Sequence, residues 1–207
     1  MKFFQIRPNA PWGDMGTILA HGMLLVPPAG STLVHLARAG PFIPPITMPG
    51  GGTLIATNEV RRDIDTGMIG PAEVRSICKS SIIEYRWEHW DRSADDPPEP
   101  LLGIEERLAK GTHSEFAAEA LGELWELVLP VGARAAFVPR VEFARIGWRS
   151  RRRGVQIDEQ SWTGSHVFHV DCGDGPRQGF GPIIATDVGR QWLQQWGSEW
   201  FRFEDCL

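Results

Sequence analysis

The chain contains one short pattern twice, first as Gly52-Thr53-Leu54-Ile55-Ala56-Thr57-Asn58-Glu59-Val60-Arg61-Arg62-Asp63-Ile64 and again as Gly181-Pro182-Ile183-Ile184-Ala185-Thr186-Asp187-Val188-Gly189-Arg190-Gln191-Trp192-Leu193. Gly, Ile, Ala, Thr and Arg are identical in register, and Asn58 faces Asp187. In each copy a short apolar run indicates a strand. The Thr-Asn or Thr-Asp pair then favours the start of a short helix.

Each copy also continues in the same way. A glycine can end the helix, at Gly67 or Gly70 in the first copy and at Gly197 in the second. A second strand candidate follows at Glu73–Ile77 or Trp200–Phe203. The sequence therefore predicts an internal repeat of two strand–cap–helix–strand units, at about 52–78 and about 181–204.

The segments outside these units carry their own periodicities. Strands are expected over 1–8, 32–37, 81–91, 135–146 and 165–172. The clearest helix is expected over about 114–128, because Phe116, Ala120, Leu124 and Leu127 recur at helical spacing before Pro130. The predicted fold class is α+β, with a largely antiparallel sheet, a few short helices and one longer helix.

The two units lie at opposite ends of the sequence. We expect them to pair within one sheet around a pseudo-twofold axis, so that residues 1–207 form a single domain. An alternative is a chain of two lobes that divides near residues 95–100, where the sequence is acidic and rich in proline.

The composition excludes several classes of protein. The 207 residues are 42% hydrophobic and carry a net charge of −5, whereas a general nucleic-acid binder is usually basic. No stretch reaches the roughly 20 apolar residues that cross a bilayer, and the N-terminus lacks the features of a signal peptide. Three widely spaced cysteines do not describe a disulfide framework. We expect a cytoplasmic bacterial protein with reduced thiols, and the sequence leaves its oligomeric state open.

No established catalytic or metal motif occurs in the chain. His166, His169 and Cys172 crowd together, but strand alternation places His169 and Asp171 on one face and His166 and Cys172 on the other. The sequence does not decide whether these residues contact a metal. We predict no cofactor and assign no catalytic residue.

An enzyme of unknown class is the alternative. His89 lies between Trp87 and Trp90 and beside Glu88 and Asp91, where it could carry a proton near neutral pH. His169 with Asp171 would be a second acid–base pair.

Cys78 is a further candidate for chemistry. It could be a thiol activated by the adjacent Lys79. The apolar residues around it, Ile77, Ile82 and Ile83, favour a buried cysteine instead.

A protein contact surface is the favoured hypothesis for the polar connectors. Nine Trp against one Tyr is an unusual ratio, and Trp serves both in cores and as an anchor at interfaces. Acidic residues near 91–99 and a basic turn at 149–153 could steer a partner electrostatically. The predicted partner-binding residues are Trp87, His89, Trp90, Asp91, Asp95, Asp96, Arg149, Arg151 and Arg152.

The two ends of the chain resemble a bacterial family of polymorphic-toxin immunity proteins, the eleventh in the usual series, best known from myxobacterial members. The likeness lies in Lys2-Phe3-Phe4-Gln5-Ile6 and in the C-terminal unit from Ile183 to Phe203. Well-known members also carry paired CxxCG motifs that look like a zinc site, and this chain has none. The resemblance implies a cytosolic protein that binds and neutralises a cognate toxin.

Overall fold

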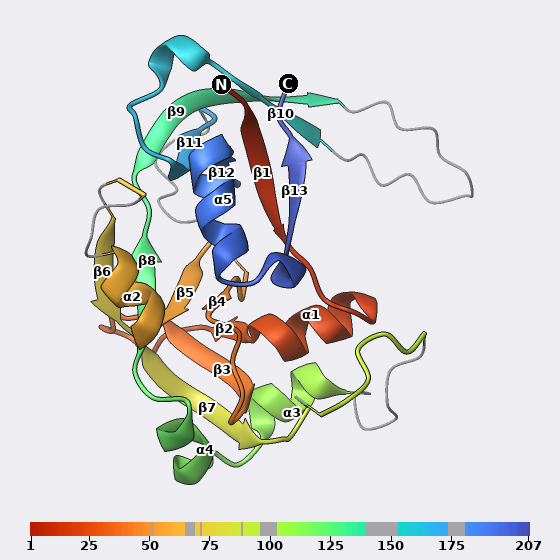
Figure 1. The fold of residues 1–207 in the computed structure, drawn as a ribbon. Helices are drawn as coiled ribbons and strands as arrows, with labels where there is room; N and C mark the ends of the chain where they lie inside the picture. Colours follow the sequence, from red (N-terminus) through yellow and green to blue (C-terminus); the bar gives the residue numbers. More distant parts are fainter. Residues whose placement is uncertain are drawn as a thin grey trace.

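Three β-sheets and five short α-helices make up the described part of the chain, and the fold is α+β (Figure 1). The computed structural model describes residues 1–50, 52–64, 69–70, 72–87, 89–95, 103–139, 153–173 and 181–207. Most strand pairs are antiparallel, and the parallel pairs are β9 with β11 and β3 with β7. No helix in these ranges is long and apolar enough to span a bilayer.

The largest sheet has six strands in the order β10, β9, β11, β12, β1, β13. Their bounds are Arg153–Ile157 (β10), Val131–Pro139 (β9), Val167–Asp171 (β11), Ile183–Thr186 (β12), Phe3–Pro8 (β1) and Phe201–Asp205 (β13). The expected first strand is therefore confirmed.

The other two sheets are smaller. The three-stranded sheet consists of β2 (Met23–Leu25), β3 (His35–Gly40) and β7 (Cys78–Glu84). The four-stranded sheet has β4 (Ile46–Thr47), β5 (Leu54–Thr57), β8 (Leu124–Val128) and β6 (Glu73–Ser76).

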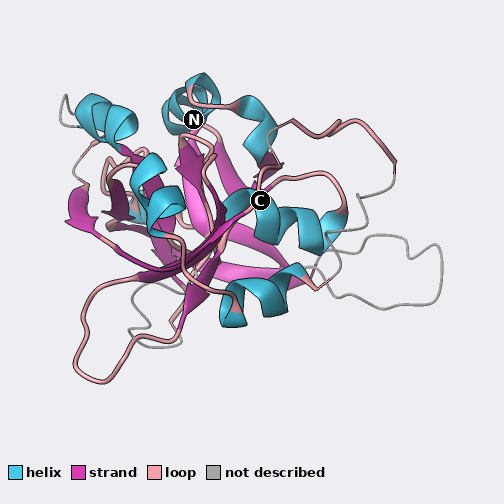
Figure 2. Cartoon of the chain, turned by 90° about the horizontal axis from the view of Figure 1, so that it is seen from below, coloured by secondary structure: helices cyan, strands magenta, loops and turns pink. Residues whose placement is uncertain are grey.

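The helices lie around the outside of the strands (Figure 2). They are α1 (Gly13–His21), α2 (Asn58–Ile64), α3 (Ile104–Lys110), α4 (Glu115–Ala120) and α5 (Asp187–Gln195). Two short 3₁₀ helices, η2 (Glu159–Ser161) and η3 (Ser198–Trp200), precede β11 and β13.

Both matching stretches form a strand that leads directly into a helix. In the second, the Thr186 side chain accepts a hydrogen bond from the Gly189 amide, which is the expected cap of α5. An antiparallel strand from elsewhere in the chain separates the two strands of each unit: β8 lies between β5 and β6, and β1 lies between β12 and β13.

The expectation that the two units pair within one sheet is wrong. β5 pairs with β4 and β8, whereas β12 pairs with β1 and β11 in a different sheet. The helices of the two units meet instead, because the Trp192 indole Nε1 donates to Asp63 Oδ2 at 2.5 Å.

The expected long helix over 114–128 is also wrong. α4 ends at Ala120, Gly122 adopts a left-handed backbone with φ of 65°, and residues 124–128 form β8. β8 is hydrogen-bonded to β5 on one side and to β6 on the other, so pairing with distant strands overrides the helical spacing.

The six-stranded sheet curls until its two ends meet. The Leu207 amide donates to the Val155 carbonyl at 2.9 Å, and the Ile157 amide donates to the Leu207 carbonyl at 3.2 Å. Residues just past β13 therefore pair with β10 at the opposite edge, which places the C-terminus beside β10 (Figure 1). Phe3, Phe168 and Ile184 belong to the apolar cluster of this sheet.

The largest buried cluster takes side chains from both ends of the sequence. Leu54 and Leu127 of the four-stranded sheet belong to the same cluster as Ile183 and Leu193 of β12 and α5. Trp87, in the segment that follows β7, and Trp200 also belong to this cluster.

Candidate functional site

The segment after β7 is held to the molecule by aromatic side chains. Trp87 is 2% exposed, and its ring meets Phe42 edge to face with centroids 5.0 Å apart. The Trp200 ring centroid lies 6.1 Å from that of Trp87, with the two rings at nearly a right angle. The Trp87 indole also donates to the Ala39 carbonyl at 3.4 Å. Trp87 therefore anchors the start of the segment in the core.

A second aromatic group fixes the middle of the segment. Trp90 packs edge to face against Tyr85, with ring centroids 5.2 Å apart, and lies 6.2 Å from Trp12. The Trp12 indole in turn donates to the Ala94 carbonyl at 2.9 Å. Residues on both sides of Asp91 are thereby tied to Trp12, which precedes α1, and Trp90 is also tied to Tyr85, which follows β7.

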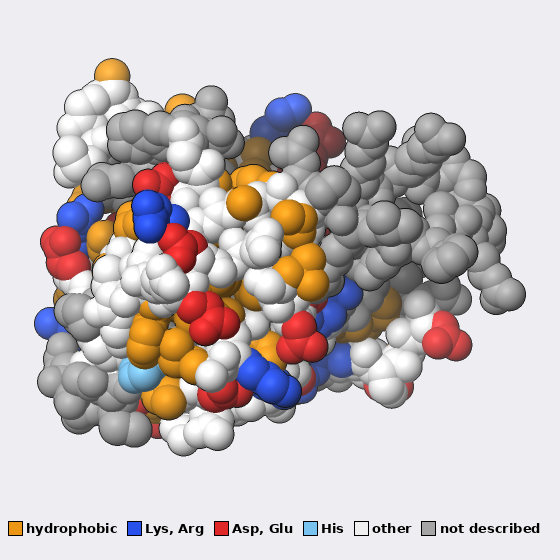
Figure 3. Space-filling model, turned by 90° about the horizontal axis from the view of Figure 1, so that it is seen from above, with side chains coloured by type: hydrophobic (Ala, Val, Ile, Leu, Met, Phe, Trp, Pro, Cys, Tyr) orange, Lys and Arg blue, Asp and Glu red, His pale blue; other side chains and the backbone are white. Residues whose placement is uncertain are grey.

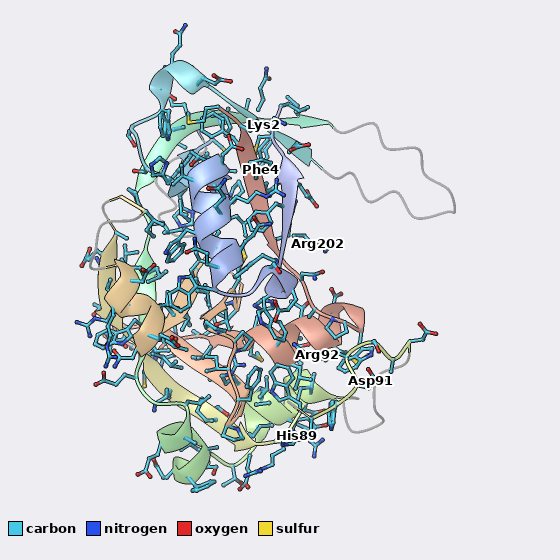
Figure 4. The ribbon with its side chains drawn as sticks, in the orientation of Figure 1. Lys2, Phe4, His89, Asp91, Arg92 and Arg202 are labelled. Atoms are coloured by element: carbon cyan, nitrogen blue, oxygen red, sulfur yellow. The ribbon has the colours of Figure 1, made fainter. Side chains whose placement is uncertain are left out.

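The exposed part of the segment, residues 89–95, is called the contact loop below. Its exposed side chains are His89, Asp91, Arg92, Ser93, Ala94 and Asp95. Figure 4 shows the labelled His89, Asp91 and Arg92 in one region near α1 and α3. This region lies away from Phe4 on β1, from Lys2 just before β1, and from Arg202 on β13.

Local interactions fix the polar side chains of the contact loop. Asp91 Oδ1 accepts from the Ser93 hydroxyl at 2.6 Å and from the Ser93 amide at 2.9 Å. The hydroxyl bond first, and the amide bond second, hold the pKa of Asp91 below its usual range. The Arg92 guanidinium lies 4.7 Å above the Trp200 ring, a cation–π contact. The loop therefore presents a fixed negative charge beside a fixed positive charge.

Two buried ionisable groups lie near the anchors. Arg38 is 0% exposed, and its Nη2 donates to the carbonyls of Ala20 and Phe42 at 3.0 and 3.3 Å. Burial lowers the pKa of Arg38 to about 9. His21 is also 0% exposed, and burial is the main cause that lowers the pKa of His21 to about 4.

The tautomer of His21 follows from its neighbours. Nδ1 accepts from the Met48 amide at 3.1 Å, so the proton of the neutral ring lies on Nε2, which is 3.2 Å from the Asn9 carbonyl. His21 is therefore a neutral structural histidine beneath the aromatic anchors.

A surface depression of about 570 Å³ lies between the end of β7 and α3. It shares Tyr85 with the anchors of the contact loop, and Glu106, Arg107 and Lys110 supply charge of both signs. The Arg107 guanidinium lies 5.4 Å from the Tyr85 ring centroid.

The predicted contact residues have different positions. His89, Asp91 and Asp95 are exposed on the contact loop, and Trp90 is half-buried at its base. Trp87 is core, so its side chain is not available to a partner. Asp96, Arg149, Arg151 and Arg152 lie outside the described residues.

The two candidate acid–base histidines are not brought together. His89 lies on the contact loop and His169 on β11, in separate parts of the molecule (Figures 1 and 4). Burial lowers the pKa of His169, and hydrogen bonding to Gly181 and Pro182 partly opposes this shift. Asp171 accepts from the Gly173 amide at 2.9 Å.

The possible metal ligand His166 lies just before β11. His166 Nδ1 lies 2.9 Å from the Thr186 hydroxyl, at the cap of α5. In the described ranges no three His, Cys, Asp or Glu side chains are grouped to hold a metal ion.

Trp12, Arg92 and Trp200 are parts of this site that no sequence pattern indicated. They come from the start of α1, the loop itself and η3, so only the fold brings them together. The high Trp content was the available signal, but composition does not say which rings meet.

Comparison with known proteins returns no matching family model, no matching curated protein and no matching solved structure. The resemblance to immunity proteins therefore stays a prediction.

On the face that carries both chain ends, the described acidic, basic and hydrophobic side chains are interspersed (Figure 3). Neither positive nor negative charge predominates among the described side chains of that view.

Proposed function

We propose that this chain is a non-enzymatic binding protein whose partner is another protein, and that the contact loop is part of its binding surface. The observation that carries the proposal is the contrast between the two sides of the loop. Trp87, Trp90 and Trp12 fix its underside, while charged side chains stand exposed on its outer side. A loop already fixed in shape loses little conformational entropy when it binds.

The charges of the loop suit a polar protein surface. Asp91 stays ionised because Ser93 hydrogen-bonds to its carboxylate, and Asp95 adds a second negative charge. Arg92 is positioned by Trp200. Charges held in place at an interface favour the right partner and raise the association rate. The basic segment with Arg149, Arg151 and Arg152 is proposed as a second contact segment.

The proposed partner is a cognate bacterial toxin, which the chain neutralises as an immunity protein in the cytoplasm. The support is the resemblance carried by Lys2–Ile6 and by the C-terminal unit. No cofactor, nucleic acid or membrane is part of this proposal.

We also infer that the two units arose by duplication of one segment. Their shared topology supports this, since each places a foreign antiparallel strand between its two strands. Asp63 and Trp192 occupy equivalent positions of the two copies and bond to each other, as residues near a pseudo-twofold axis do. Relatives whose two units are more alike would support the inference, and relatives whose two units share neither the sequence pattern nor the strand order would contradict it.

The experiment that tests the binding proposal has two stages. Tagged full-length protein is used to capture a partner from its host's lysate, and the partner is then expressed alone and together with this chain. We expect a partner that is toxic alone and harmless when the two are expressed together. An empty eluate, or a partner with no toxicity, would contradict the immunity function.

The second stage tests the contact loop with matched variants. Asp95→Lys reverses an exposed charge, and Asp91→Asn removes a charge while keeping an acceptor for Ser93. We expect each to weaken partner binding by about tenfold, measured by titration calorimetry. Glu119→Lys makes the same charge reversal as Asp95→Lys, but on the exposed side of α4, and it should leave the affinity for the partner unchanged. Equal affinity for all variants would remove the loop from the binding surface.

A further inference from the structure

The parallel pairing of β3 with β7 brings a histidine, two serines and a cysteine together. His35 is the register partner of Cys78. The pairing then skips one residue, because Leu36 pairs with Lys79 but Ala37 pairs with Ser81. Ser80 is therefore the extra residue of a β-bulge, a feature that redirects a side chain.

Four side chains form a continuous hydrogen-bonded chain at this bulge. Ser31 Oγ lies 2.8 Å from His35 Nε2, and His35 Nδ1 lies 2.7 Å from Ser80 Oγ. Ser80 Oγ lies 3.3 Å from Cys78 Sγ. The Leu33 amide donates to Ser31 Oγ at 3.3 Å and so helps to hold that end.

The bond directions of this chain are linked, because a hydroxyl group and a neutral imidazole each donate one of these protons. In one direction Ser31 donates to His35, His35 to Ser80, and Ser80 to the sulfur of Cys78. In the other direction the Cys78 thiol donates to Ser80, Ser80 donates to His35 Nδ1, and His35 Nε2 donates to Ser31. The second direction gives the thiol proton a path to the imidazole.

Lys79, which the sequence suggested as the group that activates the Cys78 thiol, is directed away from that thiol. Its ammonium group donates to the carbonyls of Ala118 and Gly122. The group connected to the thiol is His35, through Ser80. Cys78, Ser80 and His35 are all partly exposed, so a small reagent can reach them.

We propose that Cys78 is a nucleophilic thiol, that Ser80 relays its proton to His35, and that the site reacts with low-molecular-weight disulfides. The Cys78 sulfur attacks one sulfur of the disulfide, a new S–S bond forms, and the old S–S bond breaks. The proton taken up by His35 passes to the departing thiolate, which leaves as a thiol. The product is Cys78 in a mixed disulfide, and the reagent is the oxidant.

This site is separate from the contact loop. Cys78 begins β7 and the loop follows its end, and seven residues of strand span roughly 20 Å. The proposal therefore goes beyond partner binding and does not depend on it.

The test is the rate of reaction with dipyridyl disulfide, followed by the absorbance of the released thiopyridone. It uses the folded full chain in which Cys172→Ser and Cys206→Ser leave Cys78 as the single thiol. At about pH 6.5 we expect His35→Gln and Ser80→Ala each to slow the reaction by at least about tenfold. At about pH 9.5, where a free thiol is mostly ionised, the rates should converge.

Control variants distinguish loss of the proton relay from a change in the access of the reagent to the Cys78 thiol. Ser80→Thr keeps the hydroxyl and should keep most of the rate at about pH 6.5. Lys79→Gln should react as the parent does, and Cys78→Ser should not react. Circular dichroism verifies that each variant is folded.

Three results would overturn the proposal. One is equal rates for parent, His35→Gln and Ser80→Ala at the lower pH. Another is an equal loss of rate at both pH values, because that indicates changed access. The third is a parent protein that does not react.

Discussion

The sequence indicates on which face of its segment Trp87 lies, but it does not indicate whether Trp87 belongs to the core or to a binding surface. Alternation places it with Ile83 and Tyr85, and the structure buries it at 2% exposure. Its burial depends on Phe42 and Trp200, which lie far from it in the sequence. The neighbouring Asp91 is exposed and locally hydrogen-bonded, which its Asp-Arg-Ser context favours. Local chemistry was predictable at this site, whereas distant packing was not.

The buried imidazole of His21 makes a prediction about pH. Its folded-state pKa is about 4, whereas an unfolded histidine titrates near 6.5. Between these values the unfolded chain binds the proton and the folded chain does not, so the free energy of unfolding falls as pH is lowered through this range. The contribution lost is about 3 kcal/mol.

Urea unfolding between pH 7 and pH 4.5 measures this effect. His21→Gln removes the titrating group, so its stability should fall less steeply on acidification than that of the parent. His89→Gln is the matched control, because it makes the same substitution at an exposed histidine. A parent slope in His21→Gln would show that other groups cause the acid sensitivity.

At the scale of elements, the features that the sequence predicted best were the points where a strand leads into a capped helix. They depend on residues within one turn, such as the bond from the Gly189 amide to Thr186. β8 was mistaken for part of a helix because its identity comes from β5 and β6, which lie elsewhere in the chain. Local sequence signals were enough to predict α5, but they failed for β8, which is a strand because of the strands that pair with it.

Helix α5 approaches β11 so closely that Gly189 has no room for a side chain. An added Cβ would lie 2.1 Å from the His166 carbonyl oxygen and 2.9 Å from Val167 Cγ2. We therefore expect Gly189→Ala to lower the free energy of unfolding by about 2 kcal/mol, although alanine favours helices more than glycine does.

The measurement is urea unfolding at neutral pH. Val188→Ala, on the exposed side of the same turn, should change stability by less than about 0.5 kcal/mol. If Gly189→Ala were as stable as the parent, helix propensity would outweigh the close contact, and α5 would not be confined in this way.

At the scale of the whole molecule, sequence alone could not assign strands to sheets. The two units have matching sequences, yet one lies in the four-stranded sheet and the other in the six-stranded sheet. The assignment depends on β8 and β1, which insert into the units from outside. The bond between Asp63 and Trp192 links the helices that pack on these two sheets.

This link predicts energetic coupling between the two units. In a double-mutant cycle, Asp63→Ala and Trp192→Phe should show a coupling energy of about 1.5–3 kcal/mol, the value of a hydrogen bond to a charged group. Asp63→Ala with Trp162→Phe is the control pair, because the Trp162 indole donates to the Ser165 carbonyl. The control pair should be additive, and an additive Asp63–Trp192 pair would show that the bond does not couple the units.

The position of β1 also determines when the protein can fold during synthesis. β1 is made before the other strands of its sheet, and its neighbours β12 and β13 follow about 180 and about 200 residues later. Until then Phe3, Phe4 and Ile6 have no strand to join, and they stay exposed to chaperones and to other nascent chains. The six-stranded sheet can therefore form only after β13 has been made, and its long-range pairing makes that step slow.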